Sequence, residues 1–474
     1  MFCFRVLERR SWLRSSLVTA TVVLIVGVVA SCGGGSGGGS NSGNNGNAGN
    51  APAQYSLQVL RSFSDLNDAN GRGPSEPVTL DSAGNVYGST AAAGLYGKGV
   101  VFKLTPSSST PWPETVVYAF TGGADGGIVS SPLVFDSSGN LYGATAEGGD
   151  PSGCTSSESG PGCGVIFKLT PSSSGSWKET VLYAFSGGAD GAVPDWITFG
   201  PDGNLYGATS AGGNLTVCPA PGSVSGCGIV FKLTPSASGP WQEQVLHTFA
   251  GAEDGASPSG VVLDSASNVY GVTFLGGQVT KPACPVYSGE AAGCGIVFQL
   301  TTAPGGTWTE NVVYSFSGSA DGGYPQGGLT LDSGGNLYGT TSQGGDLSTA
   351  KCGTFGCGVV FRISPVGSSW SQSVLYSFTA KDDGLSPKGI ALNAQGALFG
   401  SNGGSGTCVC GGCGTVYELT PSTKLPWTLS VLAQLTTNTG TGPNAVTLDS
   451  RNNVYGTTYT CGPDGGGTAF ELVQ

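Results

Sequence analysis

Short apolar runs, separated by turn residues, recur along the chain in a fixed order. Residues 139–143, Gly-Asn-Leu-Tyr-Gly, follow a tight turn that begins at Asp136 and have the character of the second strand of a hairpin. An apolar run precedes this segment at 133–136, and two more follow it at 165–169 and 181–185. The chain holds seven copies of the segment, centred on Tyr87, Tyr142, Tyr206, Tyr270, Tyr338, Phe399 and Tyr455. Four strand types are therefore predicted, each occurring seven times.

The last two strand types of each copy are apolar on both faces, whereas a strand with one solvated face alternates apolar and polar residues. Such strands require sheets that are stacked between two others. Radial stacking of four-stranded sheets satisfies this requirement, so the pattern predicts an all-β fold, a seven-bladed β-propeller with four antiparallel strands per blade.

The two ends of the repeat region are out of phase. The region opens with a lone copy of the fourth strand at 55–63 and closes with the third strand at 468–472. The last blade is complete only when it is closed by the N-terminal strand, which removes the exposed sheet edges. We therefore expect the propeller to span 55–474.

The first 54 residues predict export and anchoring. Residues 1–31 resemble a lipoprotein signal peptide, because arginines precede a short apolar stretch that ends in Ala30, Ser31 and Cys32. Cys32 is the expected lipidation site, and an ordinary signal peptide cut near Ala30 is the alternative. Residues 32–54, rich in Gly, Ser and Asn, read as a tether. Gly33, in place of an acidic residue, resembles lipoproteins of the outer membrane, so we expect a cell-envelope location with the membrane as a partner.

Charge and cysteine content fit this location. The formal net charge of −12 disfavours a nucleic-acid partner, which needs a basic surface. Cysteines in close pairs indicate disulfides in an exported chain: Cys154/Cys163, Cys218/Cys227, Cys284/Cys294 and Cys352/Cys357. A further cluster, Cys408, Cys410, Cys413 and Cys461, favours two disulfides over a zinc site. Their pairing stays open, and we expect neither a metal nor a cofactor.

Variable loops mark one face of the predicted propeller. Loops between the second and third strands vary in length and carry the cysteines, and loops between blades carry Gly-Ala-Asp-Gly elements. Binding sites concentrate on variable loops of a uniform scaffold. The candidate ligand-face residues are Asp125, Asp190, Trp196, Asp254, Asp321 and Asp383, with Trp196 interrupting a loop between blades. The aspartates also fit structural turns, which the sequence favours over a calcium site.

Other residues favour structure over chemistry. Tryptophans that open successive fourth strands favour packing between blades over sugar stacking, and His247 replaces a tyrosine of the repeat. As the only histidine, His247 leaves no Ser-His-Asp or Cys-His arrangement, and no catalytic residue is assigned. The acidic pairs Glu253–Asp254 and Asp382–Asp383 are the nearest approach to a two-carboxylate hydrolase.

The repeat resembles the Gloeobacter/Verrucomicrobium-type (GloVer) tandem-repeat family of exported bacterial proteins. The resemblance rests on residues 139–145, 164–171 and 181–185 and covers nearly all of 55–474. It implies an exported, anchored protein with a propeller-like repeat and supplies no catalytic residues. We expect a monomeric, non-enzymatic module that binds a glycan or a protein. A carboxylate-dependent polysaccharide hydrolase or lyase is the alternative, and a structural spacer is the third hypothesis.

Overall fold

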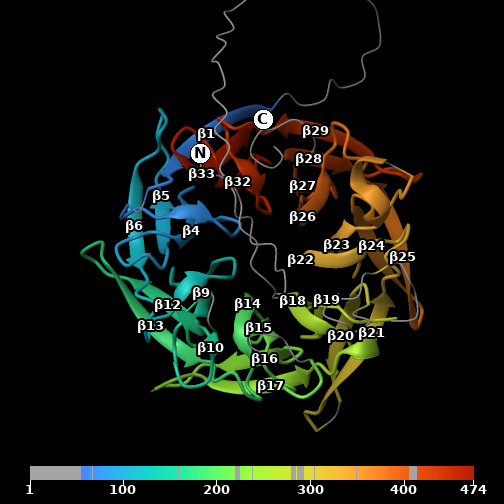
Figure 1. The fold of residues 1–474 in the computed structure, drawn as a ribbon, viewed down its shortest axis with the longest axis horizontal. Helices are drawn as coiled ribbons and strands as arrows, with labels where there is room; N and C mark the ends of the chain where they lie inside the picture. Colours follow the sequence, from blue (N-terminus) through green and yellow to red (C-terminus); the bar gives the residue numbers. More distant parts are fainter. Residues whose placement is uncertain are drawn as a thin grey trace, which may run out of the picture. The chain divides into compact units, whose positions relative to one another are not determined.

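The computed structural model describes residues 55–474 except 67, 157–159, 219–224, 238, 279–283, 285–292, 304, 349 and 405–413. Within this part, seven sheets stand around a common axis, each with its strands running antiparallel from the axis outwards (Figure 1). The prediction of a seven-bladed propeller with four strand positions per blade is confirmed.

Two strand positions form the inner half of each blade. In blades 1, 2 and 7 the innermost strand is in two pieces: β2 (Arg72–Pro74) with β3 (Thr79–Leu80), β7 (Gly127–Val129) with β8 (Val134–Phe135), and β30 (Thr441–Pro443) with β31 (Thr447–Leu448). In blades 3 to 6 it is continuous: β14 (Ala192–Phe199), β18 (Ala256–Leu263), β22 (Gly323–Leu331) and β26 (Leu385–Leu392). The second strand is β4 (Val86–Ala92), β9 (Leu141–Glu147), β15 (Leu205–Ala211), β19 (Val269–Leu275), β23 (Leu337–Gln343), β27 (Leu398–Gly403) and β32 (Val454–Thr460).

The outer half of each blade is an antiparallel pair, which is a hairpin in blades 1 to 6. The third strand is β5 (Val100–Leu104), β12 (Val165–Pro171), β16 (Ile229–Thr234), β20 (Ile296–Thr302), β24 (Val359–Val366), β28 (Thr415–Thr420) and β33 (Gly465–Val473). The outermost strand is β6 (Glu114–Ala119), β13 (Trp177–Ala184), β17 (Gln242–Thr248), β21 (Trp308–Ser315), β25 (Ser369–Ser377), β29 (Thr428–Gln434) and, in blade 7, β1 (Ser56–Ser64). Loops hold the small elements β10 (Thr155–Ser156), β11 (Gly160–Pro161), η1 (Ala252–Asp254) and η2 (Ala350–Phe355).

The ring closes between the two ends of the described chain. Strand β1 pairs with β33 in an antiparallel register that runs from Ser56 opposite Val473 to Ser64 opposite Gly465. Blade 7 also bonds to blade 1 near the axis, where the Thr447 hydroxyl donates to the Val78 carbonyl at 2.5 Å. The predicted closure by the N-terminal strand is therefore confirmed.

A buried aromatic ring under a glycine forms the centre of each blade. Phe167 of the third strand lies opposite Gly143 of the second, and a Cβ on Gly143 would be 2.3 Å from the Phe167 ring. The Gly of the Asn-Leu-Tyr-Gly run is thus required by close approach of a side chain. Phe120 of blade 1 contacts Phe167 of blade 2 with centroids 5.0 Å apart, so the aromatic cores of adjacent blades are continuous.

Tryptophans at the start of the outermost strands join neighbouring blades. Trp177 of blade 2 stacks edge-on against Tyr87 of blade 1 at 6.2 Å, and Trp241 approaches Tyr142 at 6.0 Å. The expected role in packing between blades is confirmed for these residues.

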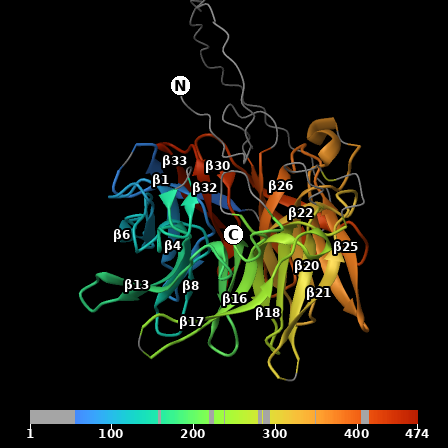
Figure 2. The same cartoon turned by 60° about the horizontal axis from the view of Figure 1, so that its bottom comes forward.

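The propeller has two unlike faces (Figure 2). We call loop face the one that carries the second-to-third-strand loops and the loops between blades, with η2 on it. We call turn face the opposite one, which carries the tight turns after the innermost strands and the hairpin turns before the outermost strands.

Candidate binding face

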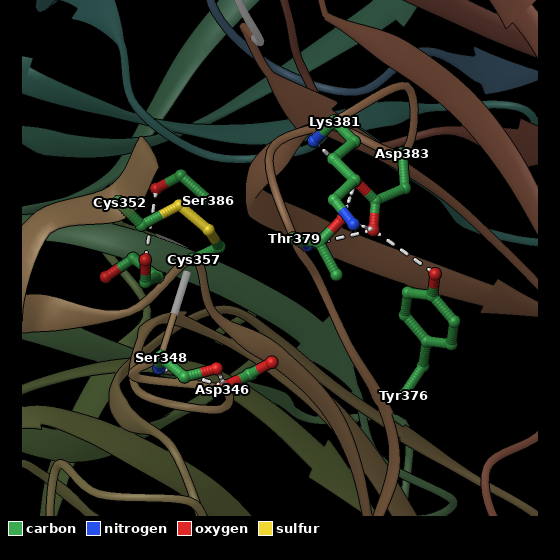
Figure 3. The surroundings of a disulfide bond; sticks show 10 residues. Asp346, Ser348, Cys352, Cys357, Tyr376, Thr379, Lys381, Asp383 and Ser386 are labelled. Atoms are coloured by element: carbon green, nitrogen blue, oxygen red, sulfur yellow. Dashed lines mark hydrogen bonds between the residues drawn. A yellow bond between two sulfur atoms is a disulfide. The ribbon is translucent and has the colours of Figure 1, made fainter. Parts of the chain in front are cut away.

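The aspartates of the loops between blades fasten their own loops. Asp190 accepts hydrogen bonds from the Ser186 backbone N–H at 2.8 Å, the Ser186 hydroxyl at 2.5 Å and the Tyr183 hydroxyl at 3.2 Å. Asp383 accepts bonds from Tyr376, Thr379 and Lys381 in the same way (Figure 3). Asp125 and Asp321 repeat the arrangement.

The tyrosine donors of these loops keep their protons. Burial, together with the charge of Asp383, raises the pKa of Tyr376 to about 12. The phenol therefore donates to the carboxylate throughout the neutral pH range. These bonds show how the aspartates shape the face, whereas contact of the same carboxylates with a ligand stays a prediction.

His247 takes the place of the tyrosine in the outermost strand of blade 3, β17. Its Nε2 lies 3.0 Å from Asp254 Oδ1, and its ring contacts Phe249 edge-on at 4.6 Å. Tyr183 makes the equivalent contacts with Asp190 and Phe185 in blade 2. The prediction that His247 is a packing substitution is confirmed.

Disulfides brace the second-to-third-strand loops. The four predicted short-range pairs are formed: Cys154–Cys163, Cys218–Cys227, Cys284–Cys294 and Cys352–Cys357, the last shown in Figure 3. Cys408, Cys410 and Cys413 lie outside the described residues. Cys461 is buried and has no disulfide partner within the described part of the chain, so the pairing of this cluster stays a prediction.

Each braced loop is bonded to the next blade. The Cys163 carbonyl accepts a bond from the Val193 N–H of blade 3 at 2.8 Å, and Val193 has a φ of 56°, in the left-handed region. The same bond joins Cys227 to Ser257 at 2.9 Å. The sulfurs also pack on the loop between blades, because a Cβ on Gly187 would be 2.5 Å from Cys154 Sγ. The disulfide and the loop residues beside it are therefore bonded to the neighbouring strand.

Trp196 lies elsewhere than predicted. It belongs to β14, where it pairs with Ala208, and does not interrupt a loop between blades. The strand tolerates the nearby Pro194 because the innermost strand is an edge. The indole reaches towards blade 5, since a Cβ on Gly328 would be 3.2 Å from its ζ2 carbon. It lines a cavity of about 390 Å³ at the axis, together with apolar residues such as Val78, Ile390 and Val446.

Two carboxylates lie near the axis beside this cavity. Glu76 precedes Pro77, and Asp195 precedes Trp196, and both of these neighbours line the cavity. Burial and the like charge of Asp195 raise the pKa of Glu76 well above its usual range. Glu76 lies between β2 and β3 of blade 1 and Asp195 lies in β14 of blade 3, so both belong to the innermost strands, which are next to the axis.

Exposed apolar side chains gather on the loop face. Among the described residues, twelve large apolar side chains are exposed, and eight of these belong to loops or strand ends of this face: Leu66, Leu95, Tyr96, Leu215, Val217, Leu347, Phe355 and Tyr459. Leu66 is 70% exposed and Tyr96 is 55% exposed. Sequence reasoning missed these residues, although apolar residues next to loop cysteines, such as Val217 beside Cys218, were a usable signal.

The described residues contain neither a cluster of metal-ligating side chains nor a membrane-spanning helix. No group of three or more His, Cys, Asp and Glu side chains there is placed to hold a metal ion. No helix there has the length and apolar character needed to cross a membrane.

Comparison with known proteins gives fold neighbours at low similarity. No curated protein matches the chain. Hydrazine synthase from Kuenenia stuttgartiensis is 13% identical with a TM-score of 0.49, covering 84% of this chain and 96% of that one. A gluconolactonase from Xanthomonas campestris is 13% identical with a TM-score of 0.39, covering 74% and 87%. At this level the likeness carries no argument about activity.

The repeat itself identifies the family. A family model described as the Gloeobacter/Verrucomicrobia repeat matches residues 33–216 and 149–349, which together cover more than half of the chain. The four disulfides and a family of exported repeats indicate an extracytoplasmic protein. The chain belongs to the Gloeobacter/Verrucomicrobia repeat family.

Proposed function

We propose that the protein is a binding module of the cell envelope, anchored in the outer membrane by a lipid on Cys32, which holds an extracellular partner on its loop face. The observation that carries the proposal is that eight of the twelve exposed apolar side chains among the described residues lie on this face. Four of the eight, Leu66, Leu95, Tyr96 and Tyr459, belong to the neighbouring blades 7 and 1. Apolar surface exposed in one region is typical of interaction sites. It favours a protein partner over a glycan, and a monomeric module is sufficient for this role.

The bonds within the described parts of the loops support the proposal. Disulfides, aspartate-centred turns and bonds to the next blade hold these parts before any partner arrives. A preorganised surface loses less conformational entropy on binding, so more of the contact energy appears as affinity.

The first described strand begins on the face opposite the proposed site. Strand β1 begins at the turn face, where the Tyr55 hydroxyl donates to the carbonyl of Asn452 in the turn between β31 and β32. The start of the propeller is therefore separate from the loop face.

The test compares exposed apolar residues on the two faces. In full-length protein, Tyr96→Ser with Phe355→Ser changes the loop face, and Val366→Ser with Leu425→Ser is the matched control on the turn face. Binding is measured by surface plasmon resonance against fractionated envelope proteins and a glycan array. We expect the loop-face variant to bind its partner about ten-fold or more weakly, and the control to bind normally.

Other outcomes contradict the proposal in different ways. Equal loss in both variants, or no loss in the loop-face variant, would remove the loop face from binding. Absence of any ligand would favour the spacer hypothesis. Turnover of an arrayed polysaccharide would favour the alternative, a carboxylate-dependent hydrolase or lyase, for which the Glu76 and Asp195 pair near the axis is the supporting observation.

A further inference from the structure

A second hollow lies on the turn face, between blades 1 and 2. It has a volume of about 690 Å³ and is lined by residues of both blades. We call it the turn-face groove, defined by Tyr87, Lys103, Thr115, Phe135 and Trp177. Its size is in the range of small-ligand sites, too small for the surface of a folded protein.

The floor of the groove is one row of side chains across blade 1. Tyr87 in β4 pairs with Lys103 in β5, and Lys103 pairs with Thr115 in β6. Side chains at paired positions of a sheet share a face, so phenol, ammonium and hydroxyl stand side by side. The Lys103 ammonium lies 5.6 Å from the centroid of the Tyr87 ring and has no ion pair among the described residues.

The wall of the groove is aromatic and belongs to blade 2. Phe135 contacts Tyr87 edge-on at 5.1 Å, and Trp177 contacts it at 6.2 Å. Trp112 and Trp427, at the same strand position in other blades, are only 7% and 6% exposed. Trp177 is half-buried, so part of its indole faces the groove instead of protein.

The same combination of tyrosine, lysine, phenylalanine and tryptophan occurs at one further junction between blades. At the junction of blades 2 and 3, the corresponding residues are Tyr142, Lys168, Phe199 and Trp241. At the next junction, Leu263 takes the place of the phenylalanine, and the lysine, Lys232, is bound to Asp202 at 2.8 Å. Two adjacent copies of one small site suit a ligand with a repeating structure.

We propose that the turn-face groove binds a glycan chain. The flat C–H face of a pyranose ring matches the aromatic wall, and its hydroxyls match the Lys103 ammonium and the Thr115 hydroxyl. Flat apolar rings flanked by a few polar groups give both the stacking area and the orientation that a sugar needs. This inference concerns the opposite face from the proposed partner site and does not depend on it.

The test uses full-length protein and isothermal titration calorimetry with cellotetraose, xylotetraose, chitotetraose and tetragalacturonate. We expect at least one of them to bind at millimolar concentration or below. Trp177→Ala should weaken that binding about ten-fold, and Lys103→Gln should weaken it by a smaller factor. Trp308→Ala is the matched control, since it removes the tryptophan at a junction that lacks the third aromatic ring; it should bind like the wild type.

Thermal unfolding of each variant separates loss of the site from loss of the fold. Lys103→Gln keeps the inference testable if Trp177→Ala unfolds, because Lys103 is partly exposed and forms no ion pair among the described residues. Absence of binding by all four tetrasaccharides would overturn the inference. Unchanged binding by folded Trp177→Ala and Lys103→Gln, or equal loss in Trp308→Ala, would overturn it as well.

Discussion

At the scale of single residues, the core contains one tyrosine hydroxyl at a position where the other blades have phenylalanine. Six blades have Phe under the glycine of the second strand, and blade 6 has Tyr417 there. The Tyr417 side chain is fully buried, and its hydroxyl has no hydrogen-bond partner within the described structure. Burial raises the pKa of this phenol, so it stays neutral and its cost is that of an unsatisfied polar group.

We therefore predict that Tyr417→Phe stabilises the protein. Removal of the hydroxyl should raise the free energy of unfolding by about 1 kcal/mol, measured by urea denaturation. The reverse change in blade 5, Phe361→Tyr, is the control and should lower it by about 1–3 kcal/mol. A less stable Tyr417→Phe would mean that the hydroxyl has a partner that offsets its burial.

The sequence supported some residue assignments better than others. The match of His247 to a tyrosine position was visible because the repeat aligns the two residues along one strand type. The reason for the glycine was not visible, because the ring above Gly143 comes from Phe167 on another strand. Cross-strand contacts of this kind depend on register, which a single strand's pattern does not state.

At the scale of elements, the loops between blades provide an internal comparison. Asp382 and Asp383 are neighbours in one loop, but Asp383 is 7% exposed and accepts bonds from three residues, whereas the Asp382 side chain is exposed. Because their surroundings differ, removal of each carboxylate should change the free energy of unfolding by a different amount.

We predict that Asp383→Ala lowers the free energy of unfolding by about 1–3 kcal/mol, because it leaves several partly buried donors without an acceptor. Asp382→Ala should change it by less than about 0.5 kcal/mol. Differential scanning fluorimetry of the two variants checks both values. Similar behaviour of the two variants would show that the carboxylate of Asp383 does not hold the loop.

Loop assignments were the least secure part of the sequence reading. The turn-forming role of the aspartates and the short-range disulfides follow from local spacing. Trp196 was misplaced because its strand already begins at Ala192, within the stretch that was predicted to be a loop between blades. The strand carries Pro194 and Asp195, which on an ordinary strand would indicate a loop.

At the scale of the whole molecule, the architecture was predictable because it rests on a repeat and on its phase. The offset between the strand at 55–63 and the one at 468–472 required ring closure, and the pairing of β1 with β33 confirms it. The turn-face groove was not predictable, because two blades contribute its floor and wall. Its side chains, such as Tyr87 and Phe135, looked like ordinary core residues in each blade.

Carboxylates between blades make stability depend on pH. Glu179, Glu243 and Glu310 occupy one position of the outermost strands, and each has a buried oxygen without a hydrogen-bond partner in the described structure. Burial raises the pKa of each to about 7, and an aspartate of the preceding blade adds to the effect. Their ordinary value of 4.5 applies in the unfolded chain.

The folded state therefore holds these protons more tightly than the unfolded state. Their stabilising effect is complete below pH of about 4.5 and is lost as the pH rises through about 7. We predict that the melting temperature falls between pH 5.5 and 8, measured by differential scanning calorimetry.

A glutamine variant tests the role of these carboxyl groups. Glu179→Gln imitates the protonated form, so at pH 8 it should raise the free energy of unfolding by about 1 kcal/mol after allowance for solvent screening. It should also make the melting temperature depend less on pH. The control, Glu253→Gln in the exposed part of η1, should leave the profile unchanged. Stability that rises from pH 5.5 to 8 would mean that these glutamates are ionised in the folded protein, and that water or a cation reaches the junctions between the blades.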